Sequence, residues 1–250
     1  MRFVGKKVLV TGGARGIGEA TALAFLREGA TVAVGSRAQA SYDAFRARHP
    51  DITAQSAIGE ISSQREAASV VGAAIEKLDG LDILVNSAGY FVEVKVEDID
   101  QAHWDMTMNT NVAGTFFASQ AALPALKASG GNIVNLASDA GIIGYPNGAA
   151  YSASKAAVIN LSRAMVLELA TAVRINCVCP GNVDTDMIRN AADASLSAHA
   201  YLRAARERSP MKRMALPDEV AAAILYLASS EAGFVNGAIL SIDGGGVCGF

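Results

Sequence analysis

The apolar residues of this chain follow two alternating patterns. Short unbroken apolar runs are typical of strands buried on both faces, whereas apolar residues that recur every three or four positions predict amphipathic helices. Strands are expected at 8–10, 31–34, 52–57, 82–86, 132–137, 174–179 and 238–243, and the pattern is weakest at 52–57. Helices are expected at 19–29, 41–48, 63–78, 99–129, 149–169 and 217–227.

Strands that alternate with helices predict an α/β fold: a doubly wound, seven-stranded parallel sheet with helices on both faces. The chain contains no linker, internal repeat or low-complexity segment, so a single domain over 1–250 is the simplest organisation. The long helix 99–129 should bend where Asn109, Asn111 and Gly114 interrupt its apolar pattern.

Composition and charge argue against several functions. The 21 Lys and Arg residues and the 24 Asp and Glu residues are scattered, and the net charge of −3 predicts no surface for nucleic acid or an anionic membrane. The uncharged stretch 106–126 carries Pro124 and several polar residues, which indicates a buried helix rather than a membrane span. The first residues lead into a strand and not a signal peptide, so we expect a cytoplasmic protein.

The three cysteines predict neither disulfides nor a metal site. Cys177, Cys179 and Cys248 are too few and too unevenly spaced for a disulfide framework, and no His lies near enough to complete a C-x-C metal site. We expect reduced thiols and no bound metal.

A glycine-rich turn follows the first predicted strand. In TGGARGIG, Gly12, Gly13, Gly16 and Gly18 lie directly between a strand and a helix. Glycine permits a tight turn and lets a pyrophosphate approach the amide groups of a helix N-terminus, where the helix dipole favours negative charge. The spacing differs from the common fingerprint G-x-G-x-x-G, so the strand–turn–helix context carries the prediction of a nucleotide site.

Three polar side chains are expected to converge further along the chain. Tyr151 and Lys155 stand four residues apart in a predicted helix and therefore share one face. Ser138 ends the apolar run IVNLAS, and the Gly and Pro residues that follow predict a loop that can bring Ser138 to face Tyr151. This arrangement would join a hydroxyl donor, a phenolic acid and an ammonium group.

Elementary electrostatics gives Lys155 a role in this group. A phenol must lose roughly two to three pKa units from about 10 to act as a base near neutrality, a difference of about 3 to 4 kcal/mol. An ammonium group at about 4 Å, with an effective dielectric constant near 20, contributes about 4 kcal/mol. We therefore expect Lys155 to be sufficient to lower the pKa of Tyr151.

Five motifs in this order resemble the short-chain dehydrogenase/reductase family: TGGARGIG, NSAG at 86–89, Ser138, YSASK at 151–155 and PGNVDT at 180–185. The resemblance runs from Lys7 to Gly245. It implies a Rossmann-type domain that binds a nicotinamide cofactor across the carboxyl ends of its strands, usually in a homotetramer.

The resemblance also implies roles for individual residues. Tyr151 would be the general acid/base, and Lys155 would activate it and hold the nicotinamide ribose. Ser138 would hold the substrate oxygen, and Asn111, which lies three residues before Gly114, would take part in a proton relay. The implied cofactor-binding residues are Gly12, Arg15, Gly16, Ile17, Gly18, Ser36, Arg37, Glu60, Ile61, Asn86, Ala88, Gly89, Tyr151, Lys155, Pro180, Gly181, Val183 and Thr185.

Two positions depart from the family pattern. Glu60 stands where the family usually has an Asp beside the adenine, and Ser87 replaces the second Asn of NNAG. A longer carboxylate can still reach the adenine amino group, and Ser87 leaves Asn86 and Gly89 in place. We expect the contacts of these two residues with the cofactor to differ in detail from the family pattern, and cofactor binding to be retained.

The residues after the second predicted strand favour NADP over NAD. An acidic residue there would accept the adenosine ribose hydroxyls and repel a 2′-phosphate. This chain has Ser36 and Arg37 instead, and Arg15 lies in the glycine turn, so two guanidinium groups are available for the phosphate. The alternative is NAD binding with Arg37 in solvent.

The sequence thus predicts an NADP-dependent oxidoreductase that interconverts a ketone and a secondary alcohol on a small-molecule substrate. One alternative is a 3-oxoacyl-carrier-protein reductase, which needs a basic docking surface where the turn LKASGGN offers only Lys127. The other is a non-catalytic dinucleotide-binding scaffold or regulator, which has no need of Ser138, Tyr151 and Lys155 together.

The substrate cannot be named from the sequence, although its pocket can be outlined. The polar segment 186–211 is expected to be irregular and to form a substrate lid. Arg203, Arg206 and Arg208 in this segment either meet an anionic substrate or form a solvated helix face. The other expected wall residues are Tyr90, Asp139, Ile142, Ile143, Tyr145 and Asn182.

Overall fold

The computed structural model describes residues 1–249. Its strands form one parallel sheet in the order β3-β2-β1-β4-β5-β6-β7. The strands are β1 (Lys7–Thr11), β2 (Thr31–Ser36), β3 (Gln55–Ile58), β4 (Ile83–Asn86), β5 (Asn132–Leu136), β6 (Arg174–Pro180) and β7 (Ile239–Ile242). The predicted seven-stranded parallel sheet is confirmed.

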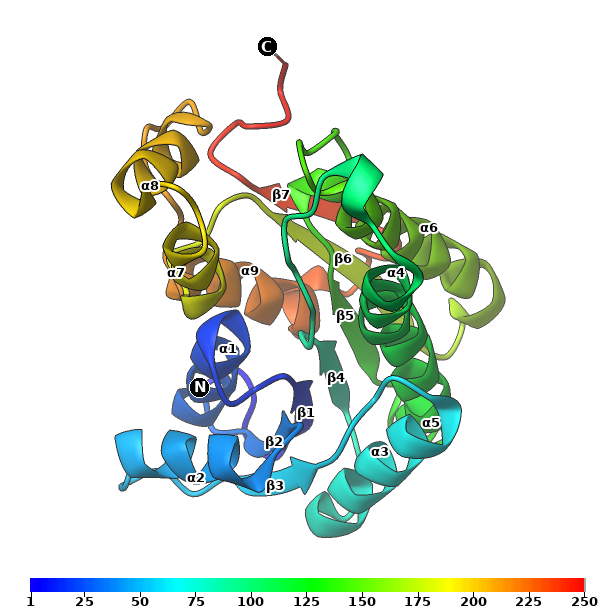
Figure 1. Ribbon diagram of the computed structural model, residues 1–250. Helices are drawn as coiled ribbons and strands as arrows, with labels where there is room; N and C mark the ends of the chain where they lie inside the picture. The colour runs from blue at the N-terminus through cyan, green and yellow to red at the C-terminus, as the bar shows by residue number, and fades with distance from the viewer. Residues whose placement is uncertain (250) are drawn as a thin grey trace.

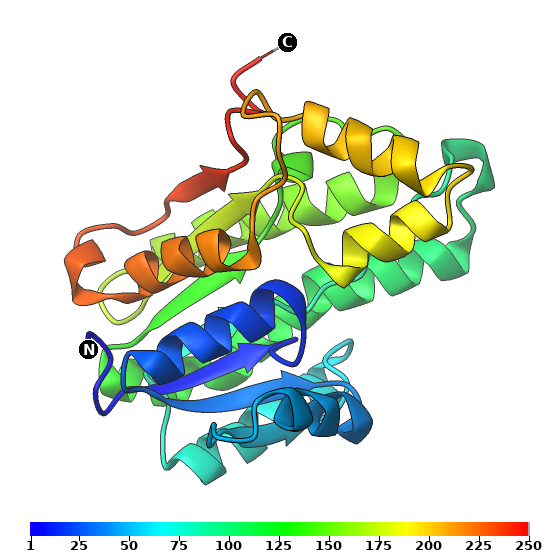
Figure 2. The same cartoon turned by 90° about the vertical axis from the view of Figure 1, so that its left-hand side faces the viewer.

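Helices cover both faces of the sheet (Figures 1 and 2). One face carries α1, α2 and α9, and the other carries α3, α5 and α6. The bounds are α1 (Gly16–Arg27), α2 (Gln39–Arg48), α3 (Gln64–Leu78), α4 (Gln101–Met108), α5 (Gly114–Ser129), α6 (Ala149–Leu169), α7 (Asp186–Asp193), α8 (Ala198–Glu207) and α9 (Pro217–Ala228). No helix within residues 1–249 combines the length and the apolar character that crossing a bilayer requires.

The strands are apolar on both faces because each face packs against a helix layer. In β1, Val8 and Val10 join the cluster that contains Phe25 of α1, whereas Leu9 joins the cluster that contains Leu126 of α5. All five side chains are completely buried. At about 1.5 to 3 kcal/mol for each fully buried large aliphatic side chain, this two-sided burial explains the unbroken apolar runs in the sequence.

The strand order reverses between β1 and β4. From β1 the chain proceeds to β2 and β3 on one side, and from β4 it proceeds to β5, β6 and β7 on the other. The loops that leave β1 and β4 therefore diverge and open a crevice at the carboxyl edge of the sheet, which is where doubly wound folds bind ligands. The glycine turn, Ser138 and Pro180 all lie at this edge.

Two segments differ from the sequence prediction. The third strand is shorter and lies later, at Gln55–Ile58, because only Ala57 of this outer strand is buried and the apolar pattern is correspondingly weak. The segment 186–211 is not irregular but contains α7 and α8. Each of these helices has a narrow apolar stripe, and Ile188, Ala205 and Met214 form a small separate cluster.

The predicted interruption of the long helix is a π-helical turn, Asn109–Ala113, between α4 and α5. Such turns insert one extra residue into a helix and are frequent at functional sites. The extra residue changes which side chains face inward, and here the inward residue is Asn111, which is completely buried.

Candidate active site

The turn between β1 and α1 presents free backbone N–H groups at the carboxyl edge of the sheet. Gly12 has φ 63°, and a Cβ there would lie 2.8 Å from the Cα of Ala88, so the turn packs directly against the loop after β4. Helix α1 begins at Gly16, and within residues 1–249 no side chain caps its N-terminus. Uncapped N–H groups next to a glycine turn fit a pyrophosphate.

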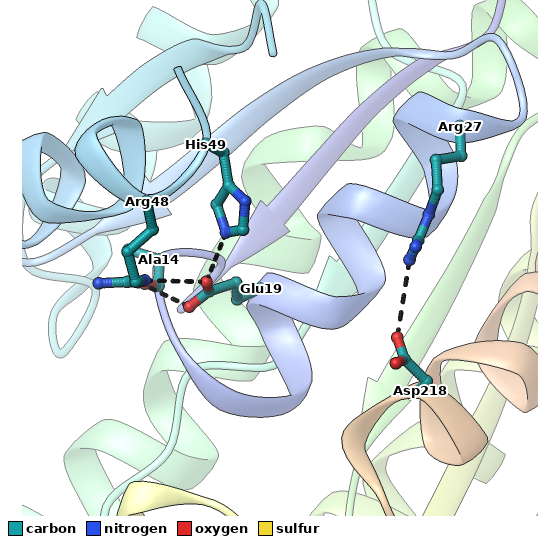
Figure 3. A network of polar contacts seen from close by, with 6 residues as sticks. All are labelled: Ala14, Glu19, Arg27, Arg48, His49 and Asp218. Carbon is teal, nitrogen blue, oxygen red and sulfur yellow. Dashed lines mark hydrogen bonds and ion pairs between the residues drawn. The ribbon is translucent and has the colours of Figure 1, made fainter. Parts of the chain in front are cut away.

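A polar network between α1 and the end of α2 supports this turn (Figure 3). Arg48, at the end of α2, donates a hydrogen bond from Nη2 to the backbone oxygen of Ala14 at 2.8 Å and pairs with Glu19 of α1 at 2.7 Å. The Nε2 of His49 lies 2.8 Å from the same Glu19 carboxylate. No sequence motif indicated this network, because Arg48 and Glu19 are brought together only when α2 packs beside α1.

Asn111 ties the loop after β4 to α6. Its Nδ2 donates to the backbone oxygen of Tyr90 at 3.0 Å and to Oγ of Ser154 at 2.9 Å, and its Oδ1 accepts from the backbone N–H of Tyr90 at 2.8 Å. The side chain is therefore engaged in holding the loop. The predicted proton relay at Asn111 would have to run through its backbone.

Ser138 lies at the end of β5, beside α6. Its Oγ donates to Oδ1 of Asp139 at 3.0 Å, and the serine is 7% exposed. Three residues later, a Cβ at Gly141 would lie 2.7 Å from the backbone carbon of Lys155. The absence of a side chain at Gly141 thus lets the loop reach α6 and brings Ser138 close to the helix that carries Tyr151.

Tyr151 lies in the first turn of α6, with its ring against Phe91. The ring centroids of Phe91 and Tyr151 are 4.7 Å apart at an interplanar angle of 63°. Tyr145 packs on Phe91 with centroids 5.9 Å apart. Phe91 orients the phenol, and sequence reasoning missed it because the residue stands in an irregular loop with no periodic signal.

Lys155 lies one turn further along α6 and is 4% exposed. Its Nζ donates to the backbone oxygen of Leu136 at 2.8 Å and stands 5.6 Å from the centroid of the Tyr151 ring. A Cβ at Gly89 would lie 3.7 Å from this Nζ, so the ammonium group also borders the loop after β4. Lys155 is therefore positioned between the phenol and the crevice.

The pKa values correct one expectation. Burial raises the pKa of Tyr151 above its ordinary value, an effect that interaction with the Ser138 hydroxyl only partly offsets. Burial also lowers the pKa of Lys155 from 10.5 to about 8. The expectation that Lys155 alone lowers the pKa of Tyr151 is wrong because it left out desolvation, which is the largest effect on the phenol.

Comparisons with known proteins agree with this geometry. A family model described as enoyl-(acyl carrier protein) reductase matches residues 12–246. Dehydrogenase/reductase SDR family member 6 of Rattus norvegicus is 36% identical over 253 residues, which cover 98% of both proteins. The chain belongs to the short-chain dehydrogenase/reductase family.

Two further relatives cover nearly the whole of this short-chain dehydrogenase/reductase. The 3-oxoacyl-(acyl-carrier-protein) reductase of Thermotoga maritima is 34% identical over 249 residues, 98% of this chain and 99% of the relative. The ligand-free structure of the aldohexose dehydrogenase of Thermoplasma acidophilum superposes with a TM-score of 0.89 at 30% identity, and the match covers 98% of this chain and 95% of that one.

The structure brings the residues predicted to bind the cofactor of this short-chain dehydrogenase/reductase to one edge of the sheet. Arg37 directly follows β2 and Glu60 follows β3. Nε of Arg37 lies 3.6 Å from Oε1 of Glu60, and both side chains are well exposed. Asn86 differs from the rest, since its Nδ2 donates to Oγ of Ser119 and Oδ1 of Asn135 in the interior. The others lie at the carboxyl ends of the strands, in the loops that follow them or in the next helix: Gly12 and Arg15 in the turn after β1, Gly16, Ile17 and Gly18 in the first turn of α1, Ser36 at the end of β2, Ile61 after β3, Ala88 and Gly89 after β4, Tyr151 and Lys155 in α6, Pro180 at the end of β6, and Gly181, Val183 and Thr185 after it.

Two cavities are lined in part by residues of α8 and by Arg208 after it, and the first also contains Asp139, the residue next to Ser138. One of about 330 Å³ is lined by Asp139 and Arg208 among others, and one of about 240 Å³ is lined by Tyr145 and Arg208. Glu93, which sequence reasoning missed, also lines the second cavity. These cavities include four of the side chains expected to form the pocket wall, Asp139, Tyr145, Asn182 and Arg208.

Asp139 provides a test of the site's electrostatics. Burial raises the pKa of its carboxyl group, and the nearby Arg208 and the Ser138 hydroxyl offset this only in part. A raised pKa means that the folded state binds the proton more tightly than the unfolded state. The contribution of Asp139 to stability is therefore present below its unfolded pKa and is lost as the pH rises through its folded pKa.

We accordingly predict that Asp139→Asn raises the melting temperature at neutral pH, with a gain that shrinks toward zero below about pH 4. Thermal unfolding followed by circular dichroism over a pH series measures this difference. A variant that is less stable than the original protein by the same amount at every pH would contradict it, and would show that ionisation of Asp139 does not affect stability.

Proposed function

We propose that this short-chain dehydrogenase/reductase interconverts a ketone and a secondary alcohol with NADP(H), using Tyr151 as general acid/base. The observation that carries the proposal is the arrangement of Ser138, Tyr151 and Lys155 beside a crevice whose glycine turn presents the uncapped N-terminus of α1. The catalytic and cofactor-binding roles given above to single residues are part of this proposal.

The chain's own residues supply the proton chemistry. The nicotinamide ring, when bound, supplies or accepts the hydride at the carbinol carbon. Ser138 turns its hydroxyl from Asp139 to the substrate oxygen and stabilises the negative charge that develops there. Tyr151 gives that oxygen its proton in the reduction, and the raised pKa of the phenol keeps the proton available at neutral pH.

Lys155 has two functions in this scheme. Its ammonium group lies between Tyr151 and the loop after β4, where its remaining N–H donors can hold ribose hydroxyls. In the oxidative direction its positive charge favours the phenolate form of Tyr151, and the cationic ring of an oxidised nicotinamide adds a second positive charge.

The choice of NADP rests on Ser36, Arg37 and Arg15. An exposed ion pair such as Arg37–Glu60 contributes only about 0 to 1 kcal/mol, so a 2′-phosphate can displace Glu60 from Arg37. Arg15 is exposed at the start of α1 and adds a second guanidinium group at this end of the crevice. Charge-assisted bidentate hydrogen bonds to phosphate are stronger than the surface pair they replace.

We predict that Ser36→Asp combined with Arg37→Ala lowers the ratio of kcat/KM for NADPH to that for NADH by about 10-fold or more. The new carboxylate repels the 2′-phosphate, and the lost guanidinium no longer binds it. Arg65→Ala, at an exposed position of α3, is the matched control and should leave the ratio unchanged. An unchanged ratio in the double variant would assign the preference to other residues.

A 3-oxoacyl thioester is the second candidate substrate, since the relative from Thermotoga maritima is named as a reductase of that class. The aldohexose dehydrogenase relative is named for a sugar, so relatives with the same fold differ in the substrate they are named for. The test is a panel of aliphatic, aromatic, sugar-like and acyl-thioester ketones, with the near-ultraviolet absorbance of reduced nicotinamide as readout. Binding of NADPH with no turnover of any ketone would favour a non-catalytic scaffold.

A homotetramer and a cytoplasmic location also belong to the proposal. Both follow from the family resemblance. Light scattering coupled to gel filtration would test the assembly, and a monomer of 25.8 kDa would contradict it.

A further inference from the structure

Arg208 stands out among the arginines of the 186–211 segment. It follows α8 directly and lines both cavities, whereas Arg203 and Arg206 are exposed on α8. Its side chain is only half-buried, but its guanidinium carbon lies 4.2 Å from the centroid of the Tyr145 ring. This stacking holds a long, flexible side chain in one place at the boundary between the two cavities.

The guanidinium group has unused donors. Within residues 1–249, Arg208 makes no side-chain hydrogen bond and no ion pair, although its guanidinium group carries five N–H donors. The other arginine that lines a cavity is engaged: Arg213 pairs with Glu219 at 2.6 Å. A fixed, partly buried cation with free donors beside a cavity favours an anionic ligand.

Asp243, which lines the first cavity with Arg208, accepts hydrogen bonds from the backbone N–H groups of Gly245 and Val247. Two further carboxylates, Glu93 and Asp139, also line cavities with Arg208 and have other partners. Oε1 of Glu93 accepts hydrogen bonds from the hydroxyl of Tyr201 at 2.6 Å and from that of Tyr145 at 3.1 Å. Asp139 accepts from Ser138, and burial raises its pKa despite the attraction of Arg208. None of these three carboxylates forms a hydrogen bond with the guanidinium group of Arg208. The paired N–H donors of this group are therefore available to a ligand. Because these acids reduce the local positive charge, a singly charged carboxylate fits better than a phosphate.

Arg208 is also near the reaction centre. Tyr145, on which it stacks, packs against Phe91, and Phe91 packs against Tyr151. The guanidinium group is therefore separated from the catalytic phenol by two aromatic side chains. Arg208 also shares the cavity of about 330 Å³ with Asp139, the residue next to Ser138. A substrate whose carbonyl oxygen meets Ser138 and Tyr151 can therefore extend an acidic group toward Arg208.

We propose that Arg208 binds the carboxylate of the substrate, and that the substrate is an oxo acid or the corresponding hydroxy acid. This inference rests on the proposed ketone–alcohol chemistry and adds the substrate class to it.

The test compares matched substrates and matched variants. The oxo acids acetoacetate and levulinate are assayed beside their neutral methyl esters, with the neutral ketones of the panel as reference. Arg208→Gln keeps much of the side chain and removes its charge. Arg208→Lys keeps the charge but lacks the planar guanidinium group that can donate two parallel hydrogen bonds. Arg206→Gln changes an exposed arginine of the same helix and serves as the control.

We expect the original protein to prefer at least one oxo acid over its ester by about 10- to 100-fold in kcat/KM, the range of a hydrogen-bonded charge. Arg208→Gln should remove this preference by raising the KM of the acid and should leave the ester within about twofold, and Arg208→Lys should restore part of it. Arg206→Gln should retain the preference in full.

Several outcomes would overturn the inference. Equal kcat/KM for an acid and its ester in the original protein would do so. An equal fall in kcat/KM for acid and ester in Arg208→Gln would also do so, because it would indicate a structural role for Arg208. If neutral ketones are turned over and no oxo acid is preferred, Arg208 does not recognise the substrate, but the proposed ketone–alcohol activity is still supported. Bound NADPH with no turnover of any ketone overturns both.

Discussion

Tyr151→Phe should lower kcat by at least about 100-fold while the affinity for NADPH changes by no more than a few-fold. The phenylalanine ring can keep the packing against Phe91, where the centroids of Phe91 and Tyr151 are 4.7 Å apart. What it lacks is the proton that the substrate oxygen must receive. A loss confined to kcat is the expected sign of a group that acts in the transition state and not in cofactor binding.

The measurement combines steady-state kinetics with a fluorescence titration of NADPH. Tyr145→Phe is a matched control, because it removes a phenolic hydroxyl that donates to Glu93, on a ring separated from Tyr151 by the ring of Phe91. If Tyr151→Phe kept near-full activity, the proton would come from another group and the catalytic assignment would fail.

Lys155→Met should nearly abolish activity and at the same time make the protein more stable at neutral pH. Burial lowers the pKa of Lys155 from 10.5 to about 8, so the folded state holds the ammonium group at a cost. The unfolded chain binds the proton more tightly, and stability therefore rises with pH between about 8 and 10.5. Methionine removes this cost, a gain of up to about 3 kcal/mol below pH 8.

Urea unfolding of both proteins over a pH series measures the gain. The stability difference should be largest at neutral pH and should shrink as the pH rises through the folded pKa of Lys155. A Lys155→Met variant that is less stable at every pH would show that the hydrogen bond to the backbone oxygen of Leu136 is worth more than desolvation costs. A variant with full activity would separate Lys155 from catalysis.

The sequence was sufficient for the sheet because its signal is local. Buried strands such as β1 and β6 are unbroken apolar runs, and the glycine turn and the Tyr151–Lys155 spacing are also local patterns. Outer strand β3 was misplaced because its side chains are mostly half-buried. Helices α7 and α8 were missed because a polar surface with a narrow apolar stripe resembles an irregular segment.

What the sequence could not show depends on contacts between distant residues. Arg48 meets the glycine turn only after α2 docks, and Glu93 meets Tyr201 across 108 positions of sequence. The pKa of Tyr151 was misjudged for the same reason, since spacing in a helix predicts a neighbouring charge but not the loss of water around the phenol. Local motifs thus led to the proposed reacting groups, and tertiary packing determines their electrostatics.

Deuterium transfer tests the central claim most directly. The protein is incubated with NADPH that carries deuterium at the reactive carbon of the nicotinamide ring, together with the ketone panel, and the alcohols are analysed by mass spectrometry. The proposed function predicts an alcohol with one deuterium on the carbinol carbon, and none when the label is in the solvent. Alcohol labelled from solvent, or no alcohol from any ketone while NADPH is bound, would contradict it.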